Sequence, residues 1–508
     1  MATLDQEGAE LLPPQSSAID RPRVRWTQIL AISIFAFAFN FHWGALSTII
    51  LPSQVFKIVG RLQEGAALAF VLVPGAFISL MANPFFGWLS DRTQGRLAAW
   101  GRRRPYILFG TLLNVAVLIW MASARDIPSL AIGYALIQLF SNAAQAPFHA
   151  LLPDIVPTEQ RGLTSGTLGL LGTCGTISGV LIAGIFVNSS KPLAAYQQGL
   201  WITYGMIMLV MITLMLVTIF SVHDRAGTVT HDGFTGERQD GRSGEQRAWF
   251  SWLSRRMLIT IGGTLAVILL VWGIMTLWNA ENIAGIQIDG SLEQVILEVL
   301  ATVGILRLFD FNPRRDPDFA WVLATRLVMM LGIYSIQTFL QYYMRDAVGV
   351  SDPEAATTQF VIIVSIASIG SAFAVGWLSD HFGRKRMVYI SGFAMALVGL
   401  VFVITHSFVL VLAAGALFGL GYGAYLSVDW ALVADVLPSH RNFARDMGVW
   451  NVASSLPQVI APVLGGPIID AFNRAGHSVQ GYQVLFSMAI IYCIVGTVTV
   501  RFIRGVKS

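Results

Sequence analysis

The pentapeptide Gly-Trp-Leu-Ser-Asp occurs twice in this chain, at residues 87–91 and again at residues 376–380. Each copy closes a long apolar stretch and is followed by a glycine and a basic cluster, Gly-Arg-Arg-Arg at 101–104 and Gly-Arg-Lys-Arg at 383–386. The two stretches therefore mark equivalent places in two related parts of the chain.

Further matches extend the repeat outward in both directions. Upstream, Gly60 aligns with Gly349 at the spacing of 289 residues that also relates the pentapeptides. Downstream, Asp-Ile-Val-Pro at 154–157 aligns with Asp-Val-Leu-Pro at 435–438 at a spacing of 281 residues. Matches in the same order within both parts predict an internal duplication.

The composition excludes several classes of protein. Of 508 residues, 55% are hydrophobic and only 12% are Asp, Glu, Lys or Arg, whereas soluble domains carry roughly 25% charged residues. A soluble protein, a disordered protein and a nucleic-acid binder are therefore excluded. Cys174 and Cys493 both lie in apolar runs, so no disulfide framework, metal site or cofactor is predicted.

Twelve segments are long and apolar enough to cross a bilayer, which takes about 20 helical residues. They are 28–53, 65–90, 105–123, 129–152, 164–187, 200–221, 319–343, 359–379, 387–405, 408–433, 447–470 and 482–502. The predicted organisation is all-helical: a tail (1–26), a six-helix bundle (27–221), a linker (222–256), an insert (257–318), a second six-helix bundle (319–503) and a short tail (504–508).

The insert contains a further apolar run, 257–278, without a charged residue. A single additional crossing would invert the second bundle, so a second crossing has to return the chain, and 292–309 is the segment available for it. We prefer this two-helix hairpin, which gives 12+2 spans. The alternative makes 257–278 re-entrant and 292–309 a surface helix.

Loop charges favour cytoplasmic termini in a cell membrane, the inner or plasma membrane. In that orientation the cytoplasmic segments hold 26 of the 33 Lys and Arg residues, six lie outside, and Arg326 lies within a span. Such asymmetry is typical of multi-span proteins. Two bundles repeated in parallel imply a pseudo-two-fold axis along the membrane normal, with a substrate site between them at mid-depth.

The repeated motif between the second and third helices of each bundle resembles the signature of the major facilitator superfamily. Residues 90–107, SDRTQGRLAAWGRRRPYI, are similar to a stretch of the sucrose-type transporters and of the related glycoside–pentoside–hexuronide:cation symporters, as are 41–46 and 150–154. Where those carriers have an arginine before Ala-Leu-Leu, this chain has His149.

The paired motifs predict a cytoplasmic gate. Asp91 and Asp380 each end an apolar helix, where the carboxylate can face a neighbouring helix N-terminus and nearby guanidinium groups. Small residues one turn earlier allow a close helix approach. The resemblance implies the same latch role for the whole set: Gly87, Asp91, Arg102, Gly376, Asp380 and Arg384.

Few ionisable side chains lie within the spans, and such residues usually face the bundle interior. His42, His149, Arg326 and Asp429 are therefore the candidates for proton or ion coupling. Asp429 is a proton carrier, a partner of Arg326, or a helix-end acid that reaches water. His42 either titrates or is a neutral hydrogen-bonding residue, and Arg326 either faces inward or snorkels to the interface.

Uncharged polar residues form stripes at helical spacing. We interpret them, with two aromatic rings, as the lining of a substrate cavity; hydrogen bonding between helices is the alternative. The predicted substrate-binding residues are Asn40, Trp43, Asn142, Gln145, Tyr334, Gln337, Gln341, Trp450, Asn451 and Gln458.

These features predict a secondary active transporter of a small polar solute, a sugar or glycoside, driven by a proton or cation gradient. An exporter of amphipathic compounds is the alternative within transport, and a non-transporting receptor is the least favoured. Gly-Lys never occurs in the chain, so no ATP-binding loop of the Walker type exists, and no enzyme motif is present. The expected partners are the solute, the coupling ion and membrane lipid, and the expected state is a monomer.

Overall fold

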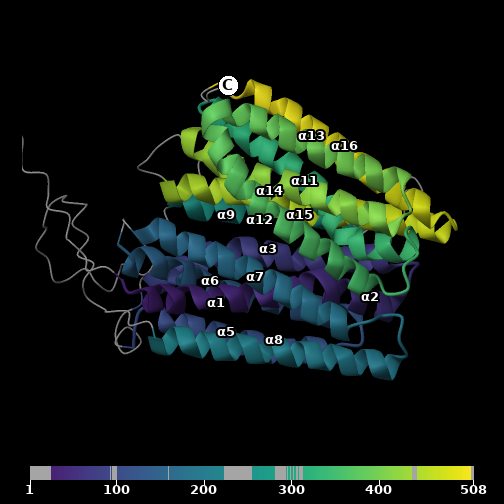
Figure 1. The fold of residues 1–508 in the computed structure, drawn as a ribbon, viewed down its shortest axis with the longest axis horizontal. Coiled ribbons are helices and arrows are strands. Elements are labelled where there is room, and N and C mark those ends of the chain that lie inside the picture. The colour runs from purple at the N-terminus through teal and green to yellow at the C-terminus, as the bar shows by residue number, and fades with distance from the viewer. Residues whose placement is uncertain are drawn as a thin grey trace, which may run out of the picture.

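The computed structural model describes residues 24–91, 93, 100–157, 160–221, 255–280, 313–436 and 443–504, with scattered residues between 293 and 307. The described chain is helical and forms two six-helix bundles, one below the other in Figure 1. Thirteen of its helices are long and apolar enough to cross a membrane, by length and composition. Each of the twelve predicted spans corresponds to one of them, which confirms the all-helical fold class.

The N-terminal half holds the first six crossings. They are α1 (Trp26–Ala45) continued by η1 (Leu46–Ile50) and α2 (Leu51–Val59), then α3 (Glu64–Asp91), α5 (Arg104–Ser123), α6 (Ile127–Ile155), α7 (Arg161–Phe186) and α8 (Leu193–Ser221). The C-terminal half holds α11 (Pro317–Asp346), α12 (Pro353–Phe382), α13 (Arg384–Ile404), α14 (Phe408–Val436), α15 (Phe443–Arg474) and α16 (Ser478–Thr499), which η5 (Val500–Phe502) follows.

The first crossing is one continuous path with a widened turn near its centre. The π-helical turn Leu46–Ile50 separates α1 from α2, and Pro52 follows directly at the start of α2. Proline lacks the N–H that an α-helix requires, and π-turns frequently mark functional sites. The interruption lies next to His42 and Trp43, which places two candidate residues beside the least regular part of this helix.

Backbone geometry supports the internal duplication. Gly60, after α2, has φ 72°, and its counterpart Gly349, just after α11, has φ 75°. Gly101 and Gly383, which precede the basic clusters, have φ 113° and 92°. These angles lie in the region that glycine adopts without steric cost. The two halves therefore turn in the same way at equivalent positions.

The halves meet through pseudo-symmetric helix pairs. The second helix of each half packs against the fifth helix of the other, α3 against α15 and α12 against α7. The first crossing also contacts α11 and α12 through η1. Two equivalent junctions are the expected result of a pseudo-two-fold axis between the halves.

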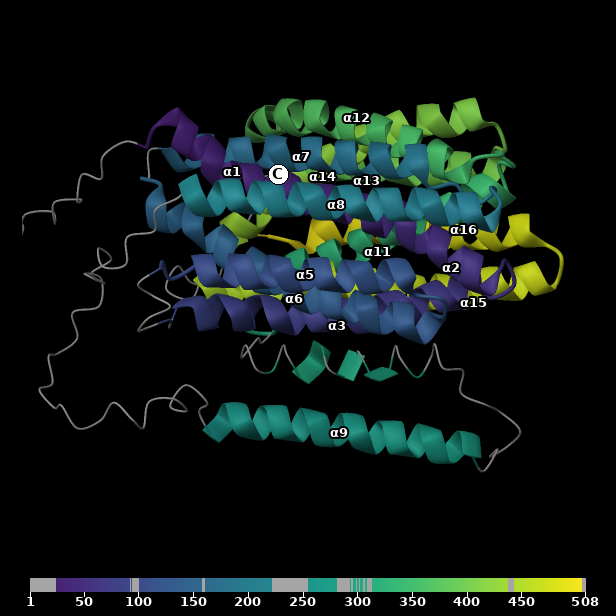
Figure 2. The same cartoon turned by 90° about the horizontal axis from the view of Figure 1, so that it is seen from below.

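The inserted helix α9 (Arg255–Ala280) stands apart from both bundles in Figure 2. Most of its large apolar side chains are exposed, among them Leu265, Leu269 and Leu277. An isolated helix that is apolar all round requires an apolar environment. Most of the predicted return helix, 292–309, lies outside the described residues, although Gly304 lies against Thr264 of α9. The hairpin stays a prediction.

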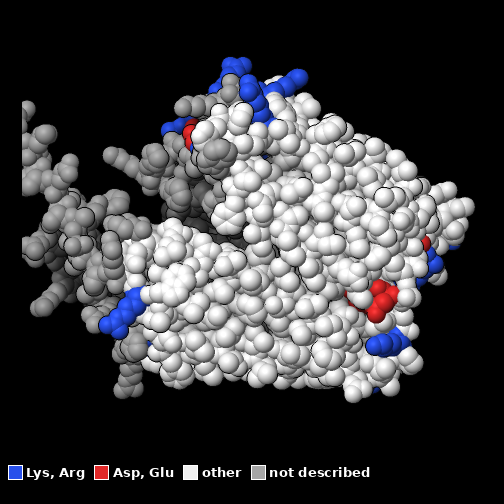
Figure 3. All heavy atoms as spheres, viewed as in Figure 1, with Lys and Arg blue, Asp and Glu red and all other residues white. Residues whose placement is uncertain are grey.

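The two ends of the bundle differ. We call the end where α1 begins and η5 ends the terminal end, and the opposite end, where α2, α11 and α15 finish, the far end (Figure 1). Figure 3 shows the surface hollowed between the halves at the terminal end, whereas the two halves meet closely toward the far end. The positions of the polar side chains explain this difference.

Candidate transport site and gates

A buried ion pair lies within the C-terminal half. Arg326 on α11 pairs with Asp429 on α14, and the two residues are only 5% and 2% exposed. Arg326 Nε donates to Ser454 Oγ at 2.6 Å, and its guanidinium lies 3.7 Å from the centre of the Trp450 ring. Arg326 therefore points inward and does not snorkel.

The other contacts of this pair compensate part of its desolvation. The Tyr425 hydroxyl donates to Asp429 Oδ1 at 3.2 Å, and the indoles of Trp430 and Trp450 lie 4.3 Å apart, centroid to centroid. A buried pair is tolerated when further hydrogen bonds satisfy its remaining atoms. Asp429 therefore forms an ion pair with Arg326, and its role as a proton carrier stays a prediction.

A polar face lies on α11 and α15 beside the pair. Gln458 Nε2 donates to the Tyr334 hydroxyl at 3.0 Å, and both Gln458 and Gln337 are exposed. Because α11 is surrounded by α12, α14, α15 and α16, exposed amides on it face space inside the bundle. The side chain of Asn451 lies outside the described residues.

In the N-terminal half, the amides bond between helices. Asn142 on α6 donates to Ser79 Oγ at 3.0 Å and accepts from Asn83 Nδ2 at 3.0 Å, both on α3. Asn142 is 3% exposed, and Asn40 donates to the Ala36 carbonyl within α1 at 2.9 Å. These contacts fit the helix-packing alternative in this conformation.

Two other predicted lining residues of this half keep some exposure. Gln145 lies half-buried one turn further along α6. Trp43, also half-buried, meets the ring of Tyr134 edge-on at 6.2 Å between centroids. An indole that is partly exposed beside a tyrosine is a suitable flat surface for a solute.

The two histidines are placed differently. His42 is fully buried, and its ring centre lies 5.0 Å from that of Trp43. Among the described residues neither of its ring nitrogens has a hydrogen-bond partner. Buried polar groups usually have partners, so this placement of His42 is energetically unfavourable. His149 on α6 is exposed, and no contact between described residues connects it to His42.

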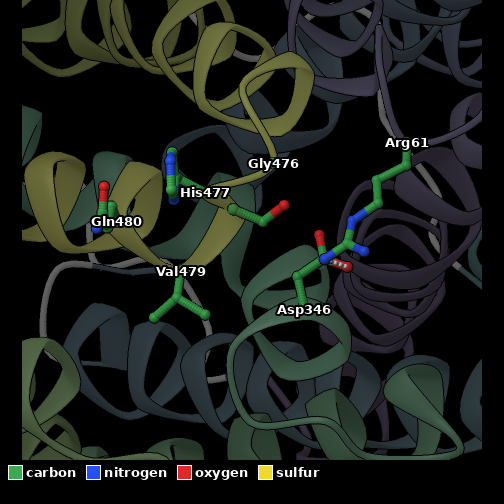
Figure 4. A pocket seen from close by; sticks show the side chains of 7 residues that line it. Arg61, Asp346, Gly476, His477, Val479 and Gln480 are labelled. Atoms are coloured by element: carbon green, nitrogen blue, oxygen red, sulfur yellow. Dashed lines mark ion pairs between the residues drawn. The ribbon is translucent and has the colours of Figure 1, made fainter.

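At the far end, two acid–base pairs join the halves. Glu64, at the start of α3, pairs with Arg345 of α11. Arg61 Nη2 lies 3.0 Å from Asp346 Oδ1, and the Tyr482 hydroxyl donates to Asp346 Oδ2 at 2.8 Å. Figure 4 shows the Arg61–Asp346 pair at the edge of a pocket of about 340 Å³ that His477 and Gln480 also line.

The α3–α15 junction at this end is closed by backbone contact. Asp470 on α15 accepts from the N–H groups of Gly65 and Ala66, each at 2.9 Å, so it caps the first turn of α3 from the opposite half. A Cβ on Gly466 would lie 2.4 Å from the Gly65 carbonyl oxygen. Only glycine allows this approach.

The α7–α12 junction is closed by a second polar set. Glu354, in the first turn of α12, accepts from Ser53 Oγ at 2.8 Å and from the Ser189 N–H at 3.0 Å. Asn188 donates to Asp352 Oδ2 at 2.6 Å, and the Tyr342 hydroxyl donates to the Pro52 carbonyl at 3.0 Å. Each of these bonds joins residues of opposite halves.

The gate residues predicted from the motif lie at the terminal end. In the C-terminal half, Arg384 pairs with Asp435. In the N-terminal half, Arg103, which follows the predicted gate residue Arg102, donates to Ser90 Oγ at 2.6 Å. A Cβ on Gly87 would meet only the Ala146 Cβ, at 3.9 Å, so the close approach expected there is not needed in this conformation. Arg102 is half-buried. The side chains of Asp91 and Asp380, and the surroundings of Gly376, lie outside the described residues.

The far-end acids were not among the residues predicted from the sequence. Glu64 and Glu354 precede the predicted spans 65–90 and 359–379 and were therefore assigned to loops. The signal available in the sequence was small: Glu64 lies four residues past Gly60, and Glu354 lies five residues past Gly349.

The described residues form two pseudo-symmetric helix bundles with a buried ion pair in one half and one end at which the halves are joined. The family model of the Major Facilitator Superfamily matches residues 29–309 and 322–507. The chain belongs to this superfamily and is not an enzyme.

Relatives with assigned functions differ in what they carry. An isoprimeverose transporter of Lactiplantibacillus pentosus is 23% identical over 42% of this chain and 45% of its own length. A multidrug efflux pump of Mycolicibacterium smegmatis is 21% identical over 35% and 36%. A sucrose transport protein of Arabidopsis thaliana is 29% identical over 30% and 28%. The chain thus spans less than half the length of these relatives.

Solved structures show the same fold over nearly the whole chain. A point mutant of the nucleoside transporter NupG superposes with a TM-score of 0.62 at 12% identity, covering 94% of this chain and 100% of that one. At such identity the likeness shows the fold alone.

Proposed function

We propose that the protein is a secondary active transporter that moves a sugar or glycoside by proton- or cation-coupled alternating access, in a cell membrane with the terminal end cytoplasmic. The observation that carries the proposal is the internal polar face, where the Gln458 amide meets the Tyr334 hydroxyl at 3.0 Å beside the exposed Gln337. Neutral amides and hydroxyls beside aromatic rings recognise sugar hydroxyls without requiring a charge on the solute.

The Arg326–Asp429 pair is the proposed coupling element. Protonation of Asp429 would leave the guanidinium without its counterion, and breaking a buried pair is strongly unfavourable. Proton uptake therefore favours a rearrangement of α11 against α14. The relatives that transport isoprimeverose and sucrose support the choice of solute class.

Uptake of labelled sugars into proteoliposomes under an imposed pH or sodium gradient tests the proposal. We expect accumulation in the wild type, and exchange without accumulation in Asp429→Asn. Gln337→Ala and Gln458→Ala should raise the KM for the sugar. The matched control is Gln198→Ala, an exposed amide on α8 that is not among the predicted lining residues.

The efflux-pump relative provides the competing outcome. Extrusion of amphipathic dyes with no uptake of any sugar would overturn the choice of solute while leaving transport intact. Sugar accumulation that persists in Asp429→Asn would overturn the coupling assignment.

A further inference from the structure

Glu354 differs from Glu64 and Asp346 because no described basic side chain forms an ion pair with it. Glu64 is paired with Arg345, and Asp346 with Arg61. Among the described residues, no Lys, Arg or His nitrogen forms an ion pair with Glu354, which is 0% exposed. A buried, uncompensated carboxylate is strongly unfavourable.

Three groups donate hydrogen bonds to one oxygen of Glu354. Ser53 Oγ, the Ser189 N–H and Gln341 Nε2 donate to Oε1 at 2.8, 3.0 and 3.2 Å. The other oxygen, Oε2, is buried and has no hydrogen-bond partner among the described residues. The α12 N-terminus contributes some positive potential, but Asp352 already holds the N-cap there by accepting from the Ala355 N–H.

A second unpartnered oxygen belongs to the same cluster. Among the described residues, Gln341 Oε1 has no hydrogen-bond partner, although the Gln341 amide lies beside the Glu354 carboxylate. The Tyr196 hydroxyl lies beside Ser53 and Glu354 and adds a further oxygen to the cluster. Unsatisfied buried oxygens are rare in native proteins, and here two occur side by side.

Two charged side chains around this cluster, Lys57 and Asp352, form hydrogen bonds with other groups. Lys57 Nζ donates to the Lys191 carbonyl at 3.1 Å and lies 5.3 Å from the centre of the Tyr196 ring. Asp352 accepts from Asn188 and from the Ala355 N–H. Glu354 therefore carries a negative charge that no described basic side chain compensates. The cluster around it consists of Ser53, Ser189, Tyr196, Gln341 and Glu354. Its unpartnered atoms among the described residues, Glu354 Oε2 and Gln341 Oε1, are both oxygens.

We propose that this Glu354 cluster binds a sodium ion when the far end is closed. Carboxylate, amide and hydroxyl oxygens are the ligands that hard cations prefer, and a single carboxylate is neutralised by a monovalent ion. Because Ser53, Ser189 and Tyr196 belong to the N-terminal half and Gln341 and Glu354 to the C-terminal half, the ion would hold the halves together. The inference deepens the cation coupling of the proposed function and rests on it only for the link to transport.

Binding of radioactive sodium to the purified full-length protein, at constant ionic strength with choline as the replacement ion, tests the site without any solute. We expect saturable binding that Glu354→Gln abolishes. Tyr196→Phe should weaken it at least ~10-fold, since ligand oxygens set the affinity of such sites. The latter variant keeps the Tyr196 ring and removes only its hydroxyl oxygen, so it tests that oxygen as a ligand.

Tyr343→Phe is the matched control. It removes a hydroxyl that does donate, to the Phe402 and Thr405 carbonyls within the C-terminal half. It should lower thermal stability and keep sodium affinity unchanged.

The site would be overturned if the wild type bound no sodium. It would also be overturned if Glu354→Gln and Tyr196→Phe each bound sodium as tightly as the wild type. Stabilisation of the wild type by acid with no response to sodium would also overturn it, in favour of a proton on Glu354. Sodium binding without sodium-driven uptake would retain the site and reject only its role in coupling.

Discussion

The far end and the terminal end of this molecule use similar residues in different ways. At the far end, acids and their donors come from opposite halves, as in Glu64–Arg345 and Ser53–Glu354. At the terminal end, Arg384 pairs with Asp435 of its own half. The pairs between the halves hold the far end closed, whereas the Arg384–Asp435 pair does not itself join the halves.

The proposed alternating access requires that these two patterns exchange. The hollow at the terminal end (Figure 3) and the contacts at the far end correspond to one of the two states in that proposal. The following predictions use spin labels at two exposed pairs, Leu62 with Gln480 at the far end and Trp100 with Phe382 at the terminal end. The exposed Cys174 and the buried Cys493 are first replaced.

The largest effect is expected from Arg345→Met. It leaves Glu64, which is 0% exposed, without its counterion, and breaking a buried pair costs about 3–5 kcal/mol. The Leu62–Gln480 distance should lengthen and the thermal midpoint should fall. The double variant Arg345→Met with Glu64→Gln should restore much of the wild-type Leu62–Gln480 distance and of the wild-type thermal midpoint. An unchanged far-end distance would contradict the role of this pair.

Gly466→Ala should act next in size. Its added methyl group would lie 2.4 Å from the Gly65 carbonyl oxygen, and overpacking of this kind costs about 1–3 kcal/mol. We expect a far end that fails to close and slow transport. Gly169→Ala is the control, since a Cβ there meets nothing within 4 Å. Equal behaviour of the two variants would refute a tight α3–α15 junction.

Asp470→Asn should have a smaller effect. The amide can accept at only one oxygen, so one of the two bonds from Gly65 and Ala66 is lost, at about 1 kcal/mol. The far-end distance distribution should broaden. Asp318→Asn, at the terminal end, where Asp318 accepts from the Arg504 N–H at 2.8 Å, should leave that distribution unchanged. A response to both variants would show that the effect is not local.

Arg384→Gln should change stability least. Its pair with Asp435 is partly exposed, and such pairs contribute about 0–1 kcal/mol. If the motif also forms the cytoplasmic latch, the Trp100–Phe382 distance should shift toward the open state and uptake should slow, with little change in unfolding temperature. Unchanged distance and uptake would reject the latch.

Sequence patterns predicted the helices well because crossing a bilayer imposes length and apolarity on each segment alone. The aligned glycines, Gly60 with Gly349 and Gly101 with Gly383, were also visible, since a positive φ has a strong residue preference. The sequence predicted that Tyr334, Gln337 and Gln341 on α11 all line the substrate cavity. In the structure Tyr334 and Gln337 belong to the internal face, while Gln341 contacts Glu354 at the far-end junction.

The sequence by itself determined the twelve apolar helices of the two bundles, the duplication and the short set of charges at depth. Only the tertiary structure decided which end is closed, that Arg326 meets Asp429, and that Glu64 and Glu354 are buried. The physical reason is that an acid at a helix end is solvated or desolvated according to what packs on it. Here the covering surface belongs to the other half of the chain, hundreds of residues away in sequence.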